Sequence, residues 1–258
     1  MNGGAENTTA RRSWMARLFN RRQAAVLADR YLDTMLADRW NTLLLLLQAP
    51  LLALMTVMVW QNVRNPTASL YFVMVLSALW LGCMDACREI VKERALFLRE
   101  RMVNLEVGAY LWSKLRVLAL LNAVQVVLYA AIVTSQLDLR IAMGWLLLNL
   151  MLTTLVGTAL GLLISSLVSR SDHAVGIVPL VILPQILFSE VAIASDAFRG
   201  ASETVYRLMP SRWAFENLRE IALDSTITLE AALKLLPLAG FGLCFLTLSL
   251  LLLAMKRY

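Results

Sequence analysis

The chain has 258 residues, of which 59% are hydrophobic and only 16% are charged. A soluble domain has roughly 45–50% apolar residues, so a chain of this size and composition cannot hide its apolar surface in a water-soluble core. A net charge of +6 would suggest nucleic-acid binding in a soluble protein, but Lys and Arg also mark the cytoplasmic side of membrane proteins. Composition therefore excludes an ordinary soluble domain and predicts an all-α integral membrane protein.

The N-terminal region, residues 1–39, is polar and basic, so the first apolar run is not a cleavable signal peptide. Within it, Arg22–Arg39 is amphipathic, since Leu27, Tyr31 and Met35 recur every four residues. Charged residues lie off that stripe. The pattern predicts an interfacial helix that lies on the inner leaflet and leads into the first span.

Six apolar segments approach the length of about 20 residues that a spanning helix needs. They are Asn41–Val63, Asn65–Met84, Val117–Leu137, Ile141–Ser169, His173–Ser189 and Leu235–Met255. The fifth is the shortest and ends at Glu190. It contains Pro179 and Pro184, and since proline disfavours a straight helix, we expect a break there. We see no internal repeat and no low-complexity linker. We therefore expect residues 40–258 to form one six-helix membrane domain.

Lys and Arg are distributed unevenly among the connections between the spans. Residues 11–39 are rich in Arg, and residues 88–116 are rich in both Lys and Arg, whereas the loops after the first and third spans carry only Arg64 and Arg140. The bias of positive charge towards the cytoplasm predicts that both termini are cytoplasmic. Residues 196–230 break the trend, but the segment is long enough to cross as a small folded unit. We expect it to be an external, re-entrant helical segment before the last span.

The connection after the second span, Arg88–Leu105, is amphipathic and densely charged. Its apolar stripe steps by four and three residues and consists of Val91, Ala95, Leu98, Met102 and Leu105. This spacing predicts one surface helix. Two interpretations remain open: a solvated helix anchored by its apolar side, or a coupling element that offers charges to a cytoplasmic partner.

The polar residues of the spans give two further indications. No span carries an ionisable residue near its middle, as ion-coupled transporters usually do. The sequence also lacks a G-x-x-x-x-G-K-[ST] motif, so if ATP drives this protein, a partner brings the ATPase. The amides Gln48, Asn122 and Gln125 either line a substrate path or bond between helices.

Small residues within the spans indicate helix packing. Gly157 and Gly161 form a G-x-x-x-G pattern, which is typical of close helix contact. Cys83 and Cys87 lie on one helix face, but no further ligand lies near them in the sequence, so we expect packed small side chains and no metal site.

Four motifs, in the order of the spans, resemble the membrane domain of G-subfamily, type 2 ABC exporters in their bacterial form. They are Gln48-Ala49-Pro50 in the first span, Glu93-Arg94-x-x-Phe97-x-Arg99-Glu100-Arg101 after the second, Phe188-Ser189 at the end of the fifth, and Pro210-Ser211-Arg212-Trp213-Ala214-Phe215-Glu216 before the last. The second motif resembles the family's coupling helix. The third resembles its Phe-Ser-Gly motif.

The resemblance implies a permease that pairs with a second copy or a homologous permease around a central path, above two ATPase subunits. The implied coupling residues are Glu93, Arg94, Phe97, Arg99, Glu100 and Arg101. The implied path or gate residues are Leu183, Leu187, Phe188, Glu190 and Val191. ATP and Mg would bind to the partner ATPase, and this chain would hold no cofactor. An amphipathic or lipid-like substrate is expected, because apolar spans bound the path.

The sequence departs from the family pattern at the gate. Glu190 replaces the usual Gly, which suggests a wider, wetter exit with water or an Arg as its partner. Val191 and Ala192 replace a bulky leucine pair found in some members. The alternative to a permease is a non-transporting membrane scaffold or assembly subunit. An intramembrane enzyme ranks last, because the spans contain no paired Asp, His cluster or Ser–His arrangement.

Overall fold

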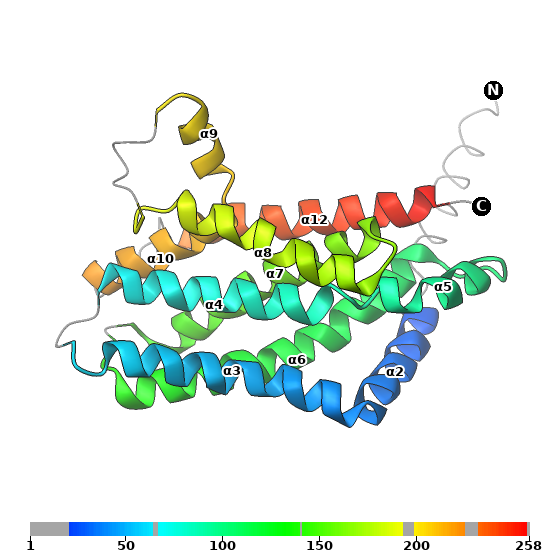
Figure 1. Cartoon of the computed structure of the whole chain (residues 1–258), viewed down its shortest axis with the longest axis horizontal. Helices are drawn as coiled ribbons and strands as arrows, with labels where there is room; N and C mark the ends of the chain where they lie inside the picture. Colours follow the sequence, from blue (N-terminus) through cyan, green and yellow to red (C-terminus); the bar gives the residue numbers. More distant parts are fainter. Residues whose placement is uncertain (1–20, 64–66, 140, 193–198, 225–231, 257–258) are drawn as a thin grey trace, which may run out of the picture.

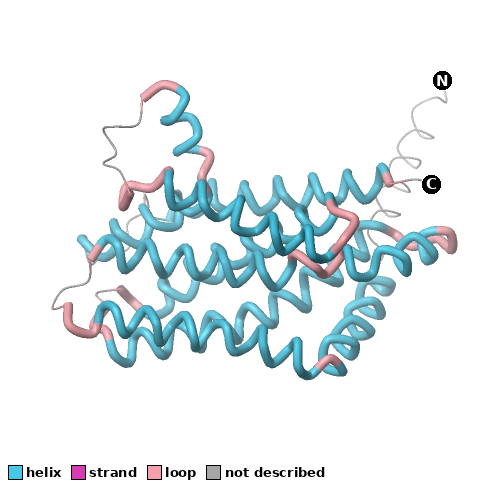
Figure 2. The backbone as a smooth tube through the Cα atoms, viewed as in Figure 1, coloured by secondary structure: helices cyan, strands magenta, loops and turns pink. Residues whose placement is uncertain are grey.

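The computed structural model describes residues 21–63, 67–139, 141–192, 199–224 and 232–256, and in these ranges it consists of helices and their connections, without strands (Figure 2). The helices are α2 (Arg21–Ala37), α3 (Arg39–Trp60), α4 (Ala68–Ala86), α5 (Arg94–Arg101), α6 (Val107–Gln136), α7 (Met143–Leu167), α8 (Ser171–Leu187), α9 (Ala201–Arg207), α10 (Pro210–Asp224) and α12 (Leu235–Met255), with a 3-10 turn, η1 (Val91–Glu93). The predicted all-α class is confirmed.

Five helices of the described chain, α3, α4, α6, α7 and α12, are long and apolar enough to cross a membrane. The remaining expected span, the fifth in chain order, corresponds to α8, which is apolar but has only 17 residues. At 1.5 Å per residue it rises about 25 Å, somewhat less than a hydrocarbon core of about 30 Å. The order of the apolar segments therefore agrees with the prediction, and the fifth is the shortest in both.

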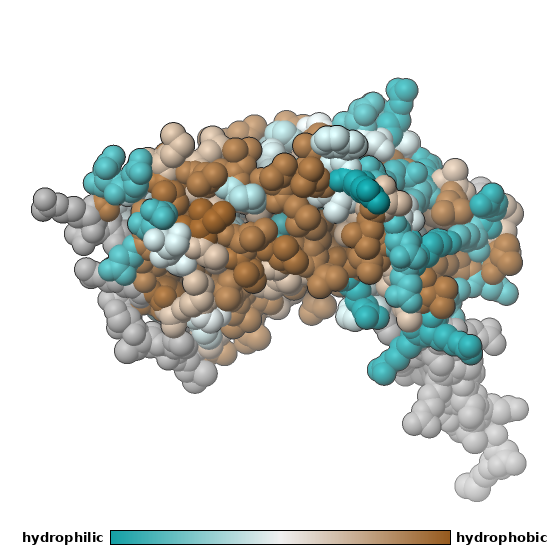
Figure 3. Space-filling view, turned by 90° about the horizontal axis from the view of Figure 1, so that it is seen from below, coloured by the Kyte–Doolittle hydropathy of each residue, from teal (hydrophilic) through white to brown (hydrophobic). Residues whose placement is uncertain are grey.

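The long helices lie alongside one another, and the short ones gather at the two ends of the bundle (Figure 1). At one end, here called the basic end, α2 crosses the bundle at a steep angle, and α5 lies next to the last turn of α12. The opposite end, here called the α10 end, carries α9 and α10. The space-filling view shows a broad apolar middle with hydrophilic residues towards both ends (Figure 3).

Two boundaries near the basic end differ from the prediction. Helix α6 begins at Val107, ten residues before the predicted Val117, because Tyr110 and Lys114 are buried against neighbouring elements rather than solvated. The predicted single helix Arg88–Leu105 is wrong. The chain instead forms η1 and the short α5, and then reverses at Asn104, whose positive φ of 66° is a conformation that Asn tolerates.

The predicted apolar stripe of this connection is wrong in part. Val91 is buried, but Met102 is 65% exposed, because α5 ends before it and the following turn carries it away from the bundle. Phe97, which lies off the stripe, is buried instead. In contrast, the stripe expected on α2 is confirmed at Leu27 and Tyr31, both buried against the bundle.

Helices α4 and α7 form the closest contact of the bundle, and glycines make it possible. A Cβ added at Gly157 would lie 2.3 Å from the carbonyl oxygen of Leu79, and one added at Gly82 would lie 1.9 Å from that of Thr154. Neither approach is physically possible for a side chain. The expected packing role of the G-x-x-x-G pattern is therefore confirmed, and Gly82 completes it from the other helix.

Of the amides Gln48, Asn122 and Gln125, the last two bond between helices, whereas the buried Oε1 of Gln48 has no hydrogen-bond partner among the described residues. Asn122 Nδ2 donates to Thr158 Oγ1 at 2.6 Å, and Gln125 Nε2 donates to the carbonyl oxygen of Leu45 at 3.0 Å. Both amides are fully buried. Of the two interpretations of these residues, the structure favours the one in which they hold helices together.

The glycine contact predicts a sharp difference between two alanine substitutions in one helix. Gly157→Ala forces α4 and α7 apart, and overpacking of this kind costs about 1–3 kcal/mol of unfolding free energy. Gly144→Ala, also in α7, has nothing within 4 Å of the added Cβ, so it should be neutral or slightly stabilising. Thermal unfolding in detergent measures both. Equal unfolding temperatures for the two variants would contradict the described contact.

Candidate functional site

The connection between α4 and α6, residues 87–106, is here called the coupling segment. It leaves α4 in a turn, passes through η1 and α5, and returns to α6 at the basic end (Figure 1). No side-chain hydrogen bond caps the start of α5. The charged residues of the segment are therefore positioned by their partners on other helices.

Glu93 is held by a buried ion pair. Its Oε2 lies 2.6 Å from Nζ of Lys114 on α6, and the Lys114 side chain is only 2% exposed. The same ammonium lies 3.5 Å from the centre of the Tyr31 ring of α2, and Tyr110 donates its hydroxyl to Glu93 at 3.4 Å. Since a buried ammonium is costly without such partners, this cluster fixes the segment to α2 and α6.

A second carboxylate, Glu89, reinforces the same junction. It is 4% exposed, it accepts a hydrogen bond from the hydroxyl of Tyr31, and it lies 2.6 Å from Nζ of Lys92. Burial, together with the negative charge of Glu89, raises the pKa of Tyr31 well above its ordinary value. Tyr31 therefore keeps its proton at physiological pH and remains a donor to Glu89.

The remaining motif residues differ in how far they are buried and in what they contact. Phe97 is buried with its ring 4.9 Å from that of Tyr110. Glu100 pairs with Arg30 of α2, which raises the pKa of Arg30. Arg94 is partly buried and Arg99 is exposed.

Arg101 binds the end of α12. Its Nη2 donates to the carbonyl oxygen of Ala254 at 2.7 Å, and its Nη1 donates to that of Lys256 at 3.1 Å and to that of Leu253. These carbonyls have no partner within their own helix, and a cation there also complements the helix dipole. Glu100 and Arg101 are therefore engaged within the subunit rather than free at its surface. Both join separate elements of the fold.

The most exposed apolar side chains of the coupling segment lie at its tip, defined here as Arg99, Met102, Val103 and Asn104. Val103 is 80% exposed and Met102 is 65% exposed, an unusual exposure for apolar side chains at the charged end of the molecule. Beside the tip, a groove of about 390 Å³ lies between α2 and α5. Arg30, Arg99 and Val103 contribute to its walls.

At the other end, α8 presents an apolar face that the described chain leaves uncovered. Leu183 is 51% exposed, Leu187 is 61% exposed, and Val191, just beyond the helix, is 42% exposed. Phe188 is partly buried. The break expected at the two prolines of α8 is not observed, because the helix continues to Leu187 through both.

Glu190 is tied to the segment before the last span. Its Oε1 accepts a hydrogen bond from the Tyr206 hydroxyl at 2.7 Å, and its Oε2 lies 2.6 Å from Nη1 of Arg219. The expectation of an Arg partner is confirmed. Burial and the bond to Glu190 raise the pKa of Tyr206. Glu216 extends the cluster, since it accepts from Tyr206 at 3.3 Å and from Arg212 at 2.6 Å. The end of α8 is thus held to α9 and α10.

Sequence reasoning missed several residues at the basic end. Lys114 looked like one more cytoplasmic marker, and Glu89 like one more loop charge. Asp85 lies at the end of α4, only 2% exposed, and its carboxylate oxygens have no hydrogen-bond partner among the described residues. The absence of ionisable residues holds for the middle of the spans but not for their basic ends.

Together, the apolar helices and the polar ends of the bundle define a multi-pass, all-helical membrane protein. Residues 22–223 match the family described as ABC-2 type transporter. The chain belongs to this family and is a permease component of an ABC transporter. In this family the ATPase activity belongs to an ATP-binding partner, and permease domains generally pair.

A curated relative agrees with this assignment. The chain is 24% identical over 164 residues to an ABC transporter ATP-binding/permease protein of Mycobacterium tuberculosis (strain ATCC 25618 / H37Rv). The match covers 58% of this chain and 18% of that relative. The chain therefore spans only a small part of the relative's length.

The buried ion pair predicts a specific pattern in single and double variants. Lys114→Met leaves Glu93 without its cation, and Glu93→Gln leaves the buried ammonium without its anion, so each should cost about 3 kcal/mol. The double variant removes both charges and should cost less than either single change. Amide hydrogen exchange in α5 measures the loosening of the segment.

A matched control exists at the α10 end. The pair Lys234–Glu220 has the same 2.6 Å separation, but its side chains are 31% and 25% exposed. Lys234→Met and Glu220→Gln should change exchange in α5 by nothing measurable. A double variant at Lys114 and Glu93 that is as loose as the sum of its singles would contradict the described coupling.

Proposed function

We propose that this chain is the transmembrane permease subunit of an ATP-binding-cassette exporter. It moves an amphipathic or lipid-like substrate outward along a path between two permease subunits, by alternating access that a partner ATPase drives. Its place is the cell inner (plasma) membrane, with both termini cytoplasmic. The observation that carries the proposal is the coupling segment, which is anchored to three helices and leaves one apolar tip exposed.

The proposed contact with the ATPase is the tip rather than the charged positions of the motif. Glu100 and Arg101 are engaged within the subunit, so they are not available to a partner without breaking the fold. Met102 and Val103 are exposed apolar side chains next to the cation Arg99. Exposed apolar side chains with a nearby cation are typical of protein interfaces, in which the apolar centre supplies most of the binding energy.

The anchors explain how motion would pass from the tip to the membrane. Closure of two ATPase subunits displaces the tip, and the ion pairs at Glu93 and Glu100 carry the displacement to α6 and α2. Arg101 carries it to the end of α12. A segment held at three points moves with its helices as a unit, as rigid-body switching requires.

The proposed path lies along α8. Its exposed leucines and Val191 form an apolar face that a second subunit would cover. An apolar face suits an amphipathic or lipid-like substrate. The cluster at Glu190 places charge at the α10 end of this face. We assign it the role of keeping α8 in a fixed position relative to α9 and α10 at the exit.

Charge placed at the tip should uncouple the ATPase without unfolding the permease. Val103→Asp, in the complex of permease and ATPase, should lower substrate-stimulated ATP hydrolysis at least tenfold, because the side chain is exposed in the subunit but buried in the proposed interface. Asp33→Lys on α2 changes an exposed charge away from the tip and should leave hydrolysis unchanged. Normal stimulated hydrolysis in Val103→Asp would show that the tip has no role in coupling.

A failure of any ATP-binding chain to co-purify with the permease would favour the alternative function, a non-transporting membrane scaffold.

Swapping the two charges of the ion pair between Glu190 and Arg219 should restore the transport that a single charge reversal removes. Arg219→Glu places two carboxylates together and should reduce transport, and the swap Glu190→Arg with Arg219→Glu should restore most of it, because like charges repel and the swapped pair attracts. Arg207→Glu, which breaks the exposed pair with Glu203, should have little effect. Transport assays in proteoliposomes measure all three. Full activity in Arg219→Glu alone would show that the cluster has no role at the exit.

A further inference from the structure

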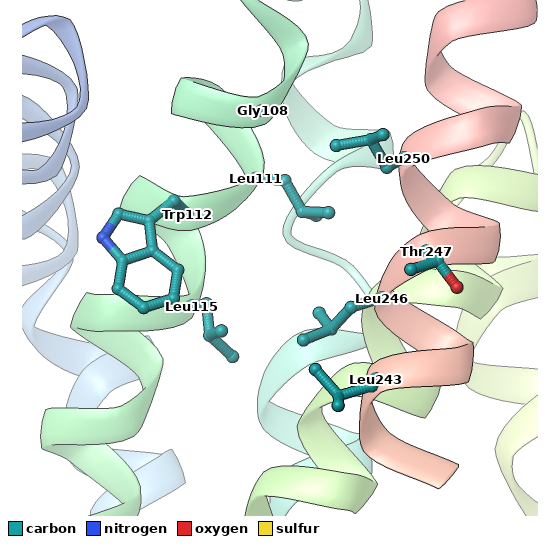
Figure 4. A pocket seen from close by; sticks show the side chains of 8 residues that line it. All are labelled: Gly108, Leu111, Trp112, Leu115, Leu243, Leu246, Thr247 and Leu250. Atoms are coloured by element: carbon teal, nitrogen blue, oxygen red, sulfur yellow. The ribbon is translucent and has the colours of Figure 1, made fainter. Parts of the chain in front are cut away.

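A lateral groove separates α6 from α12. Its volume is about 280 Å³. Figure 4 shows Leu111 and Leu115 of α6 on one side and Leu246 and Leu250 of α12 on the other. Thr247 contributes a polar atom to the lining, but its hydroxyl donates to the carbonyl oxygen of Cys244 at 2.8 Å. The groove is therefore apolar and suits a hydrocarbon chain.

A basic pocket adjoins this groove. Its volume is about 330 Å³, and it is lined by Arg21, Ala24, Trp112 and Arg116. Trp112 contributes to the lining of both cavities, so the two adjoin at this residue. Both arginines are exposed, and neither forms an ion pair with any residue that the structure describes. Two cations that form no ion pair within the described part of the chain thus lie beside an apolar groove.

The position of the two cavities along α6 corresponds to a membrane boundary. Arg116 is the last charged residue of α6, which continues without charge to Gln136. On α12, the charge-free stretch ends at Met255 and Lys256 follows. Trp is favoured where hydrocarbon meets headgroups. Trp112 and Arg116, one helical turn apart, therefore lie near the boundary between headgroups and hydrocarbon.

We propose that this composite cavity binds one anionic phospholipid of the leaflet at the basic end. The phosphate lies between Arg21 and Arg116, which supply charge-assisted hydrogen bonds, and one acyl chain lies in the groove between α6 and α12. A zwitterionic lipid would bring its own cation to the same two arginines and is disfavoured. This lipid is resident rather than cargo, since the proposed substrate path lies along α8.

The site would contribute to coupling. It contacts α2, α6 and α12, the helices to which Glu100, Glu93 and Arg101 fix the coupling segment. A lipid that bridges these three helices holds them in one arrangement. Its loss should loosen the same unit that the ion pairs hold together.

Native mass spectrometry of the purified full chain, with phosphatidylglycerol or phosphatidylcholine of identical acyl chains added back, tests the headgroup site. The wild type should retain one phosphatidylglycerol at least tenfold more strongly than phosphatidylcholine. Arg21→Ala with Arg116→Ala should abolish this preference, and the paired Lys substitutions should keep most of it. Arg39→Ala, an exposed cation outside the pocket, is the control and should change nothing. Equal retention of the two lipids, or an unaltered preference in the double Ala variant, would overturn the proposal.

The acyl groove is tested by filling it. Thr247→Trp places a large ring in the groove and should lower retention of phosphatidylglycerol about tenfold. Leu251→Trp lies on the same helix, at an exposed position that does not line the groove, and should retain the lipid as the wild type does. The unfolding temperature of each variant reports whether it folds. Equal retention in both Trp variants would overturn the assignment of the groove.

Discussion

A single ammonium group, that of Lys114, lies under the Tyr31 ring and against Glu93 at the point where α2, α6 and the coupling segment meet. Removing this cation from water is expensive, so each partner must stay in place for the fold to tolerate it. That requirement is what makes the segment stiff. Glu89, Glu100 and Arg101 then attach the segment at further points, and the tip is left as the surface on which a partner can push.

The rest of the bundle must be rigid if a displacement of the tip is to reach the membrane-spanning helices. Helices α4 and α7 meet at a distance that only glycine permits, and buried amides fasten α6 to α3 and α7. In a membrane, packing of this kind replaces the hydrophobic effect as the force between helices. In contrast, the apolar face of α8 remains uncovered in the single subunit. The molecule thus combines a stiff inner bundle with apolar outer faces, of which we assign the one on α8 to a second subunit.

Hydropathy predicted the order of the spans well, because long charge-free runs have few alternatives in a bilayer. It placed α12 at its observed bounds, but it missed the start of α6, where polar residues are buried by contacts from distant helices. The motif located a densely charged connection at the basic end, but it did not give the orientation of its residues. Periodicity cannot tell an exposed charge from one that pairs inward with α2 or α12, and it gave no signal that Lys114 was buried. An Arg partner for Glu190 could be expected, but its identity as Arg219 depends on how α10 folds back.

The central claim is that the coupling segment moves with its helices as one body. Spin labels at Val103 on the tip and Leu120 on the exposed side of α6, in the complex of permease and ATPase, measure this directly by pulsed electron resonance. The distance within one subunit should stay the same, within about 2 Å, with and without nucleotide, while the distance between the two tips of a permease pair changes. A tip that moves relative to α6 of its own subunit when nucleotide binds would contradict the account.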